Sequence, residues 1–254
     1  ITEEFSTDEI IPCAGQGIVA IQCRDKDIEM GGEGAPIGCY YHKYLIKKIN
    51  KKAAIINIGG VTNITLIYKK KLVGFDLGPG NAIIDDLVNF HYKKKFDDKG
   101  IYAKNGLVIE KLYQKFKKDI FFKKKYPKSI DRNHFKIILK NLKRYKANDS
   151  IHTASLMTTY SIIKGLEMFN FKIDLLILTG GGRKNKFIVD RLKEILKDKI
   201  KIVNIDYHGF NGDMVEAQMF GYLAVRSIKK ITISLPSVTG VKKPITGGKI
   251  YNHL

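Results

Sequence analysis

The sequence has little cysteine. It contains three, Cys13, Cys23 and Cys39, and none of them forms a C-x-x-C pair. An odd number of thiols without paired spacing argues against a disulfide framework and against a structural zinc site. We therefore expect a reduced, cytoplasmic location.

Long apolar runs are also lacking. No stretch approaches the roughly 18 residues that a membrane span needs. The opening "ITEEFSTDE" lacks the basic and then apolar pattern of a secretory signal. We expect no membrane partner. Because the first residue is Ile, we also expect that the start was processed or that the chain is a piece of something longer.

Acidic residues are scarce, with 25 Asp and Glu against 45 Lys and Arg, for a net charge of +20. Nucleic-acid-binding proteins concentrate basic residues on one face and often interleave aromatic residues. Here the basic residues are mostly Lys, in short runs such as "YKKK" where turns or exposed helix faces are expected. We expect no nucleic-acid partner, although attraction for anionic small molecules such as nucleotides remains.

The first readable structural pattern follows residue 51. The runs "AAIINIGG", "NITLIY" and "KLVGFD" predict a three-strand meander, and "NAIIDDLVNFHYKK" predicts an amphipathic helix with Asn81 as its N-cap. Between the last strand and this helix stand Asp76 and the loop Gly78-Pro79-Gly80. This arrangement presents one carboxylate at the open end of a sheet, either as a catalytic base or as a charged turn residue.

The second half predicts helices and a parallel strand pair. Residues 105–146 have a helical pattern interrupted at Pro127, and a long central helix follows with Asn148, Asp149 or Ser150 as its cap. Next, "DLLILTGGGRKNKFIVDRLKEIL" and "KIVNID" predict a β-α-β unit whose second strand is buried.

Two glycine loops follow predicted strands, Gly59-Gly60 and the run Gly180 to Gly182. Glycine lets backbone amides approach a phosphate or nucleoside without a Cβ in the way, although each loop alone also fits a turn or close packing. Neither is a dinucleotide fingerprint, because Asn185 stands where glycine is needed, and no P-loop motif is present. Two glycine loops around Asp76 fit the α/β nucleotide-binding fold of sugar kinases, Hsp70 and actin (ribonuclease H-like), in which ATP lies between two halves.

Six motifs in order carry a closer resemblance: "NIGGVTNITL", "GFDLGPGNAIIDD", "PKSIDRNHF", "LTGGGRKN", "GDMVEA" and "LPSVTG", with "DIEMGGEGAPIGCYYH" ahead of them. In this order and spacing they resemble the anhydro-N-acetylmuramic acid kinase family, over about residues 27–254. The resemblance implies an ATP- and Mg²⁺-dependent enzyme of peptidoglycan recycling. Such an enzyme opens the 1,6-anhydro ring with water and yields the 6-phosphate.

The resemblance also implies roles for individual residues. Asp76 matches the family's base, which must take a proton from the attacking water. Residues that match phosphate or adenosine contacts are Gly59, Gly60, Asn63, Gly180, Gly181, Gly182 and Asn185. Residues placed at or near the sugar are Arg24, Gly78, Gly80, Asn81 and Glu216, the last of which also fits an acid at a helix N-terminus. The sequence shows no metal-ligand cluster, and the isolated His42, His91, His152 and His208 suit structural roles better than ligation. The family suggests a homodimer.

Some positions depart from the family pattern. Ile130, Asp131 and Asn133 stand where the family has other residue types, which puts the role of the helical insert in sugar binding in doubt. Leu77 stands where Thr is common, so we expect one hydroxyl near the base to be missing.

The front of the chain departs most. Residues 6–24 resemble a segment of hydroxymethylbilane synthase (porphobilinogen deaminase) at Pro12, Gly15 to Gly17, Ile21, Cys23 and Arg24. We expect residues 1–26 to be a foreign-looking strand, 27–50 a remnant of an N-terminal domain, and 51–254 a largely complete C-terminal domain with its insert at about 105–146. The N-terminal domain and its first phosphate loop would then be mostly missing.

Three functions stay open at this point. The first is the kinase, with small-molecule sugar and ATP as its ligands. The second is a non-catalytic truncated or chimeric remnant that binds nucleotide, favoured by the absent first phosphate loop. The third and weakest is a fragment of a tetrapyrrole-pathway enzyme.

Overall fold

The computed structural model describes residues 27–49, 52–170, 172–197 and 199–247. The predictions for residues 1–26, including the deaminase-like strand and the role of Arg24, lie outside the described residues. Among the described helices, none has the length and apolar character that crossing a bilayer requires.

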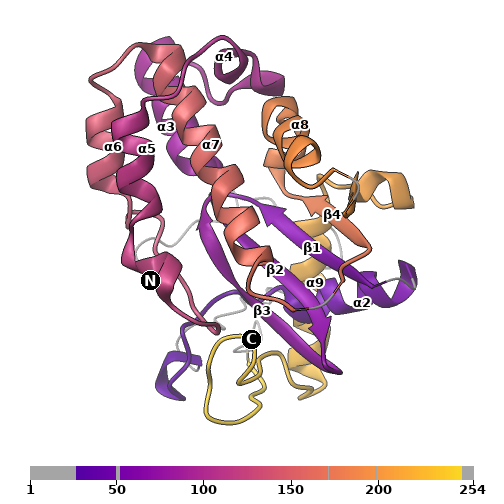
Figure 1. The fold of residues 1–254 in the computed structure, drawn as a ribbon. Coiled ribbons are helices and arrows are strands. Elements are labelled where there is room, and N and C mark those ends of the chain that lie inside the picture. Colours follow the sequence, from indigo (N-terminus) through magenta and orange to yellow (C-terminus); the bar gives the residue numbers. More distant parts are fainter. Residues whose placement is uncertain (1–26, 50–51, 171, 198, 248–254) are drawn as a thin grey trace, which may run out of the picture.

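A five-stranded mixed sheet in the order β3-β2-β1-β4-β5 forms the centre of the fold (Figure 1). The strands are β1 (Ala53–Ile58), β2 (Val61–Tyr68), β3 (Lys71–Pro79), β4 (Leu175–Thr179) and β5 (Lys201–Asn204). The first three form the predicted antiparallel meander, whereas β4 pairs parallel with β1 and β5 parallel with β4. The prediction of a buried strand at 201–204 was wrong, because β5 lies at the sheet edge and is only partly buried.

The helices predicted after the meander are present in the predicted order, whereas α2 and α4 were not predicted. The helices are α2 (Cys39–Ile49), α3 (Asn81–Tyr92), α4 (Ile101–Lys104), α5 (Glu110–Lys117), α6 (Lys136–Leu142), α7 (Ala147–Leu166), α8 (Lys186–Ile195) and α9 (Val215–Ile228). Short 3₁₀ turns lie at Asp98–Gly100, Ile120–Lys123, Gly181–Lys184 and Ile205–His208. The predicted insert at about 105–146 corresponds to α5, α6 and the turns around them.

The two faces of the sheet carry different helices, because successive strand residues point to opposite sides. On one face, Ile56, Phe75 and Leu178 belong to the large core formed with α3, α5, α6, α7 and α8. On the other face, Ile55 and Ile177 pack with α2 and with Val215 of α9. Figure 1 shows α7 along the first face and α2 and α9 behind the sheet. The second face is the one that carries the site described below.

Two predicted helix caps were wrong. Asn81 is the first residue of α3 and its side chain donates to the Ile58 carbonyl (3.2 Å), while Gly80 is the N-cap residue. Asn148, Asp149 and Ser150 lie inside α7, whose N-cap is Lys146. Their side chains instead serve tertiary contacts; the Asp149 carboxylate, for example, accepts from the Leu107 amide at 2.8 Å.

A partly buried carboxyl on α3 makes stability depend on pH. The pKa of Asp85 is raised to about 7, chiefly by burial. The Asp86 charge also raises it, the Arg132 charge lowers it, and the Asp97 charge raises it. Between the ordinary pKa near 4 and pH 7, the folded protein holds a proton that the unfolded chain releases. Folding stability therefore falls as pH rises through this window.

We expect Asp85→Asn to raise the free energy of unfolding relative to the parent more at pH 8 than at pH 4.5, because Asn carries no charge to bury. Urea unfolding at the two pH values measures this difference. Asp190→Asn, exposed on α8, is the matched control. An equal effect of Asp85→Asn at both pH values would contradict the assignment.

Candidate functional site

A row of polar side chains crosses four strands on the second face of the sheet. Asp76 of β3 pairs with Asn63 of β2, Asn63 with Asn57 of β1, and Asn57 with Thr179 of β4. Each of the four has a direct sequence neighbour in the large core on the first face, namely Phe75, Ile64, Ile56 and Leu178, so strand alternation brings all four to the second face. The row lies at the end of the sheet where the parallel strands β1 and β4 finish, the edge at which α/β sheets commonly bind ligands.

A β-bulge sets the position of Asp76. Thr62 pairs with Gly78 and Asn63 with Asp76, so Leu77 is an extra residue in β3. Bulges redirect side chains and are common beside active sites. Leu77 itself is buried in the large core, where its side chain packs against Gly165 of α7. The expectation that Leu77 costs the site a hydroxyl was therefore wrong, because this side chain points away from the polar row.

The loop after Pro127 holds the Asp76 carboxylate. The Asp76 amide donates to the Lys128 carbonyl at 3.0 Å, and Oδ2 of Asp76 accepts from Ser129 Oγ (3.1 Å) and the Ile130 amide (3.0 Å). Asp76 is only 4% exposed. Hydrogen bonds to an ionised acceptor are stronger than neutral ones and fix its orientation. The helical insert thus supports the site through Ser129 and through a backbone amide that any residue except proline supplies at position 130.

Lys128 is a buried cation next to this contact that sequence reasoning missed. Its Nζ donates to the Phe121 carbonyl at 3.2 Å and lies 4.2 Å from the centre of the Phe121 ring. The pKa of Lys128 is lowered to about 8, chiefly by burial; the Lys124 charge also lowers it, and the Asp76 charge opposes both. Its positive charge compensates part of the negative charge of the buried Asp76.

A cleft of about 740 Å³ opens above the polar row. Its walls are formed by residues 35–38 and His42 on the α2 side, by residues 129–132, and by Gly180, Gly181, Arg183, Asp213 and Glu216 on the opposite side. Of the described residues predicted for the site, it brings together Asn63, Asp76, Gly180, Gly181 and Glu216. A carboxylate and a glycine loop therefore face one shared space.

The Gly59-Gly60 turn lies outside this lining and caps α3. The Asn81 amide donates to Gly59 O (2.7 Å), and the amides of Gly80 and Ala82 donate to Gly60 O (3.0 and 3.3 Å). These bonds satisfy amides that a helix N-terminus otherwise leaves open. Contact of this turn with a phosphate stays a prediction.

The other predicted residues outside the cleft lining have packing roles. A Cβ at Gly80 would stand 2.2 Å from Gly59 O, one at Gly182 2.2 Å from Ile58 Cγ2, and one at Gly78 2.5 Å from Ser161 Oγ. The Asn185 side chain accepts from the Ile188 amide at 3.3 Å as the N-cap of α8. Their contacts with a ligand stay predictions.

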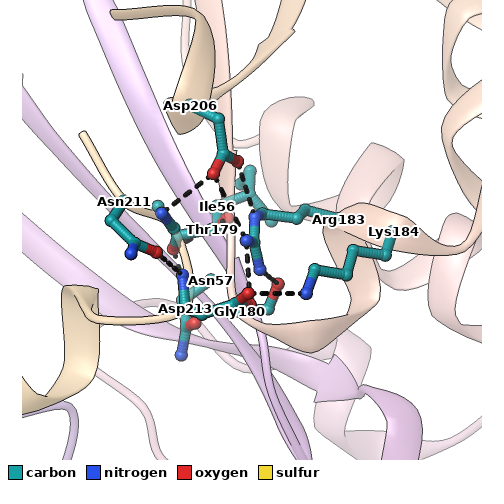
Figure 2. Close-up of polar contacts among 10 residues, drawn as sticks. Ile56, Asn57, Thr179, Gly180, Arg183, Lys184, Asp206, Asn211 and Asp213 are labelled. Atoms are coloured by element: carbon teal, nitrogen blue, oxygen red, sulfur yellow. Dashed lines mark hydrogen bonds and ion pairs between the residues drawn. The ribbon is translucent and has the colours of Figure 1, made fainter. Parts of the chain in front are cut away.

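Arg183 fixes the second glycine loop, as Figure 2 shows. It is 4% exposed, and its Nη1 donates to the Gly180 carbonyl at 3.1 Å. Its Nε and Nη2 bond to Asp206 Oδ2 (2.8 Å) and Asp213 Oδ1 (2.9 Å). The hydrogen bond from Arg183 holds the pKa of Asp206 below its usual range. The guanidinium therefore ties the glycine loop to the segment that precedes α9.

We expect Arg183→Gln to lower the free energy of unfolding by about 1 to 3 kcal/mol, because it breaks charge-assisted bonds around a buried side chain. It should also weaken nucleotide binding by loosening Gly180. The control is Arg191→Gln, whose partner Glu194 is exposed and which we expect to cost less than about 0.5 kcal/mol. Denaturant unfolding and calorimetry with ATP measure the two effects. Equal free energies of unfolding for the two variants would show that the hydrogen bonds of Arg183 do not stabilise the glycine loop.

Comparison with known proteins decides the family. A sequence model described as anhydro-N-acetylmuramic acid kinase matches residues 7–253. The chain belongs to the anhydro-N-acetylmuramic acid kinase family. The match includes residues 7–26, where the sequence also resembles hydroxymethylbilane synthase, and that second resemblance stays a prediction.

Relatives within the anhydro-N-acetylmuramic acid kinase family are similar over most of this chain. The kinase of Caldanaerobacter subterraneus is 36% identical over 252 residues, covering 92% of this chain and 63% of the relative. That of Zymomonas mobilis is 36% identical over 230 residues, covering 90% and 62%. The chain therefore spans somewhat less than two thirds of the length of these relatives.

Among solved structures, a similar one is the activator of 2-hydroxyisocaproyl-CoA dehydratase from Clostridium difficile with bound ADPNP. It is 12% identical, with a TM-score of 0.45, and the match covers 77% of this chain and 69% of that chain.

The cleft offers few protein ligands to a metal ion. Within the described ranges, no three His, Cys, Asp or Glu side chains gather closely enough to hold an ion. Mg²⁺ in nucleotide enzymes commonly takes one or two carboxylates together with phosphates and waters. Glu33, Asp76 and Glu216 line the cleft and fit that limited demand.

A second cavity, of about 680 Å³, lies between α4, α7 and α8. It is lined by apolar side chains such as Phe187 and Leu156 and by charged ones such as Lys104 and Arg191. It includes none of the residues predicted for the anhydro-N-acetylmuramic acid kinase site.

Proposed function

We propose that the protein is an ATP-dependent kinase that opens 1,6-anhydro-N-acetylmuramic acid with water and phosphorylates it to N-acetylmuramic acid 6-phosphate. The observation that carries the proposal is that Asp76 and the Gly180-Gly181 loop line one cleft. Family membership supplies the substrate. The fold type, a sugar-kinase and actin-like nucleotide-binding domain, is part of the same proposal.

Asp76 is the general base in this proposal. Water attacks the anomeric carbon and its proton passes to the Asp76 carboxylate. The bridging oxygen leaves that carbon and bonds to the γ-phosphorus of ATP, while the bond between this phosphorus and ADP breaks and ADP leaves. One carboxylate positioned by Ser129 and Ile130 meets this demand. Mg²⁺, held by the phosphates and a cleft carboxylate such as Glu216, would neutralise negative charge on the transferred group.

The glycine loop serves the nucleotide. Gly181 is exposed and its backbone reaches the cleft, so a nucleoside or phosphate can approach it closely. Arg183 keeps the loop in place from behind through Gly180. Catalysis of phosphoryl transfer depends chiefly on such positioning and on charge neutralisation.

One experiment separates the kinase from a non-catalytic nucleotide-binding protein. The purified protein is supplied with the anhydro sugar, ATP and Mg²⁺, and the 6-phosphate is sought by mass spectrometry beside calorimetry with ATP alone. Sugar phosphate formed in proportion to ADP supports the kinase. ATP binding without product would support the non-catalytic alternative and overturn the proposal.

A further inference from the structure

His42 lies in α2 directly over the sheet, next to the polar row. It is 4% exposed and contributes to the wall of the cleft. Its partner Thr65 stands two residues beyond Asn63 on the same face of β2. From the sequence we expected only a structural role for His42, because its partner Thr65 lies on another element.

A chain of buried hydrogen bonds starts at this imidazole. His42 Nδ1 lies 2.9 Å from Thr65 Oγ1, Thr65 Oγ1 lies 3.3 Å from Cys39 Sγ, and Cys39 Sγ lies 3.7 Å from the Pro36 carbonyl oxygen. Gly74 leaves the room for this sulfur, since a Cβ there would stand 2.2 Å from Cys39 Sγ.

The carbonyl at the end of the chain fixes its direction, because a carbonyl oxygen only accepts. The Cys39 thiol must donate to Pro36, so its sulfur accepts from Thr65, and the Thr65 oxygen accepts from His42. The thiol keeps its proton, since burial raises the pKa of Cys39 to about 12, against the Thr65 hydrogen bond and with the nearby Asp76 charge. His42 then carries its proton on Nδ1.

From this we infer that His42 presents the unprotonated Nε2 to the cleft and accepts a hydrogen bond from the bound sugar. Neutral imidazole carries one donor and one acceptor nitrogen, and the donor is used by Thr65. Burial also lowers the pKa of His42 to about 4, so the ring is neutral at pH 7. The inference rests on the proposed function for the identity of the ligand.

The chemistry of the sugar fits this acceptor. In 1,6-anhydro-N-acetylmuramic acid the anhydro bridge occupies O1 and O6 and the lactyl ether occupies O3. The C4 hydroxyl and the acetamido N–H remain as donors, and the lactyl carboxylate is only an acceptor at neutral pH. A neutral nitrogen lone pair in the same cleft as Asp76 can therefore fix the orientation of the sugar without adding charge to the site.

The tautomer is tested first, by ¹⁵N–¹H correlation spectroscopy of the histidine-labelled full chain at pH 7, with His42 assigned from its own variant. We expect the Nδ1–H form with a bare Nε2. Thr65→Ser should keep this form because it keeps the hydroxyl, while Thr65→Val should abolish the preference. An Nε2–H form in the parent would overturn the inference, whether or not the protein is a kinase.

The contact with the sugar is tested by titration of the same sample and by calorimetry. Addition of the anhydro sugar should shift the Nε2 resonance of His42. His42→Asn retains a donor for Thr65 but removes the nitrogen at the cleft, so we expect sugar affinity to fall about three- to tenfold while the unfolding midpoint stays near that of the parent. His42→Gln, which restores a polar atom near the Nε2 position, should recover part of the loss.

The outcomes separate two failures. If the parent binds the sugar but the His42 resonances and the affinity of His42→Asn are unchanged, the inference is overturned and the kinase proposal stands. If the parent binds no anhydro sugar, the proposed function fails, and the ligand named for His42 fails with it.

Discussion

Asp76→Asn is expected to abolish sugar phosphorylation, with a fall in rate on the order of 10² to 10⁴, while ATP affinity stays near that of the parent. The amide oxygen of Asn can still accept from Ser129 and Ile130, so the loop stays in place. The Asn side chain, however, cannot take the proton of the attacking water. Product formation by mass spectrometry and ATP binding by calorimetry measure the two quantities.

The matched control for this prediction is Asp131→Asn. Asp131 also lines the cleft and is exposed, and its carboxylate accepts from the Asn133 amide within its own turn. We expect it to keep turnover within a factor of about three of the parent, since it removes no group from the proton transfer. If Asp76→Asn also kept turnover within a factor of about three of the parent, Asp76 would not be the general base.

Gly181→Val is expected to weaken ATP binding and lower turnover on the order of 10²-fold, because a displacement of about 1 Å in a reacting complex can cost that much. The fold should tolerate the change, since a Cβ at Gly181 meets only Asn81 Nδ2, at 3.6 Å. Its neighbours are unsuitable for this test. A Cβ at Gly180 would stand 2.6 Å from Ile58 O and one at Gly182 2.2 Å from Ile58 Cγ2, so those variants would disturb folding.

Gly221→Val is the control, because a Cβ at Gly221 on α9 meets no atom within 4 Å. Calorimetry with ATP should give the same affinity for this variant as for the parent. If Gly181→Val also binds ATP unchanged, the triple glycine is a packing feature and the nucleotide lies elsewhere.

The strands of the meander were predictable because their signal is local. Runs of Ile, Val and Thr separated by short polar turns specify β1, β2 and β3 without help from the rest of the chain. The position of β5 in the sheet was not predictable, because the order of strands depends on which pairs form between segments far apart in the sequence. Its apolar run suggested burial, yet only one of its edges is paired.

Helix caps were predicted wrongly, and the role of Arg183 was missed, for the same reason. Asp149 looked like a cap, but its carboxylate is used by Leu107, 42 residues away. Arg183 gave no signal because its acidic partners lie 23 and 30 residues further along the chain. A side chain with two possible uses cannot be assigned until tertiary structure shows which partner is close.

The sequence predicted part of the lining of the candidate site. Asp76 and the Gly180-Gly181 loop follow strands into loops, and that local pattern led to the cleft. The Gly59-Gly60 turn has an equally suggestive sequence, yet its carbonyls cap α3. Which group of a glycine turn faces a ligand depends on backbone orientation, and composition does not encode this directly.

The polar row has a consequence for how the chain avoids misfolding. If β2 paired with β1 one residue out of register, Asn63 would turn into the large core and Ile64 would turn out beside Asp76, because side chains alternate across a strand. The buried amide would lose its solvation, and an apolar side chain would be exposed in its place. The residues proposed to bind ligand thus also penalise every odd-numbered slip of the hairpin, and substituting them with apolar residues would make wrong pairings competitive during folding.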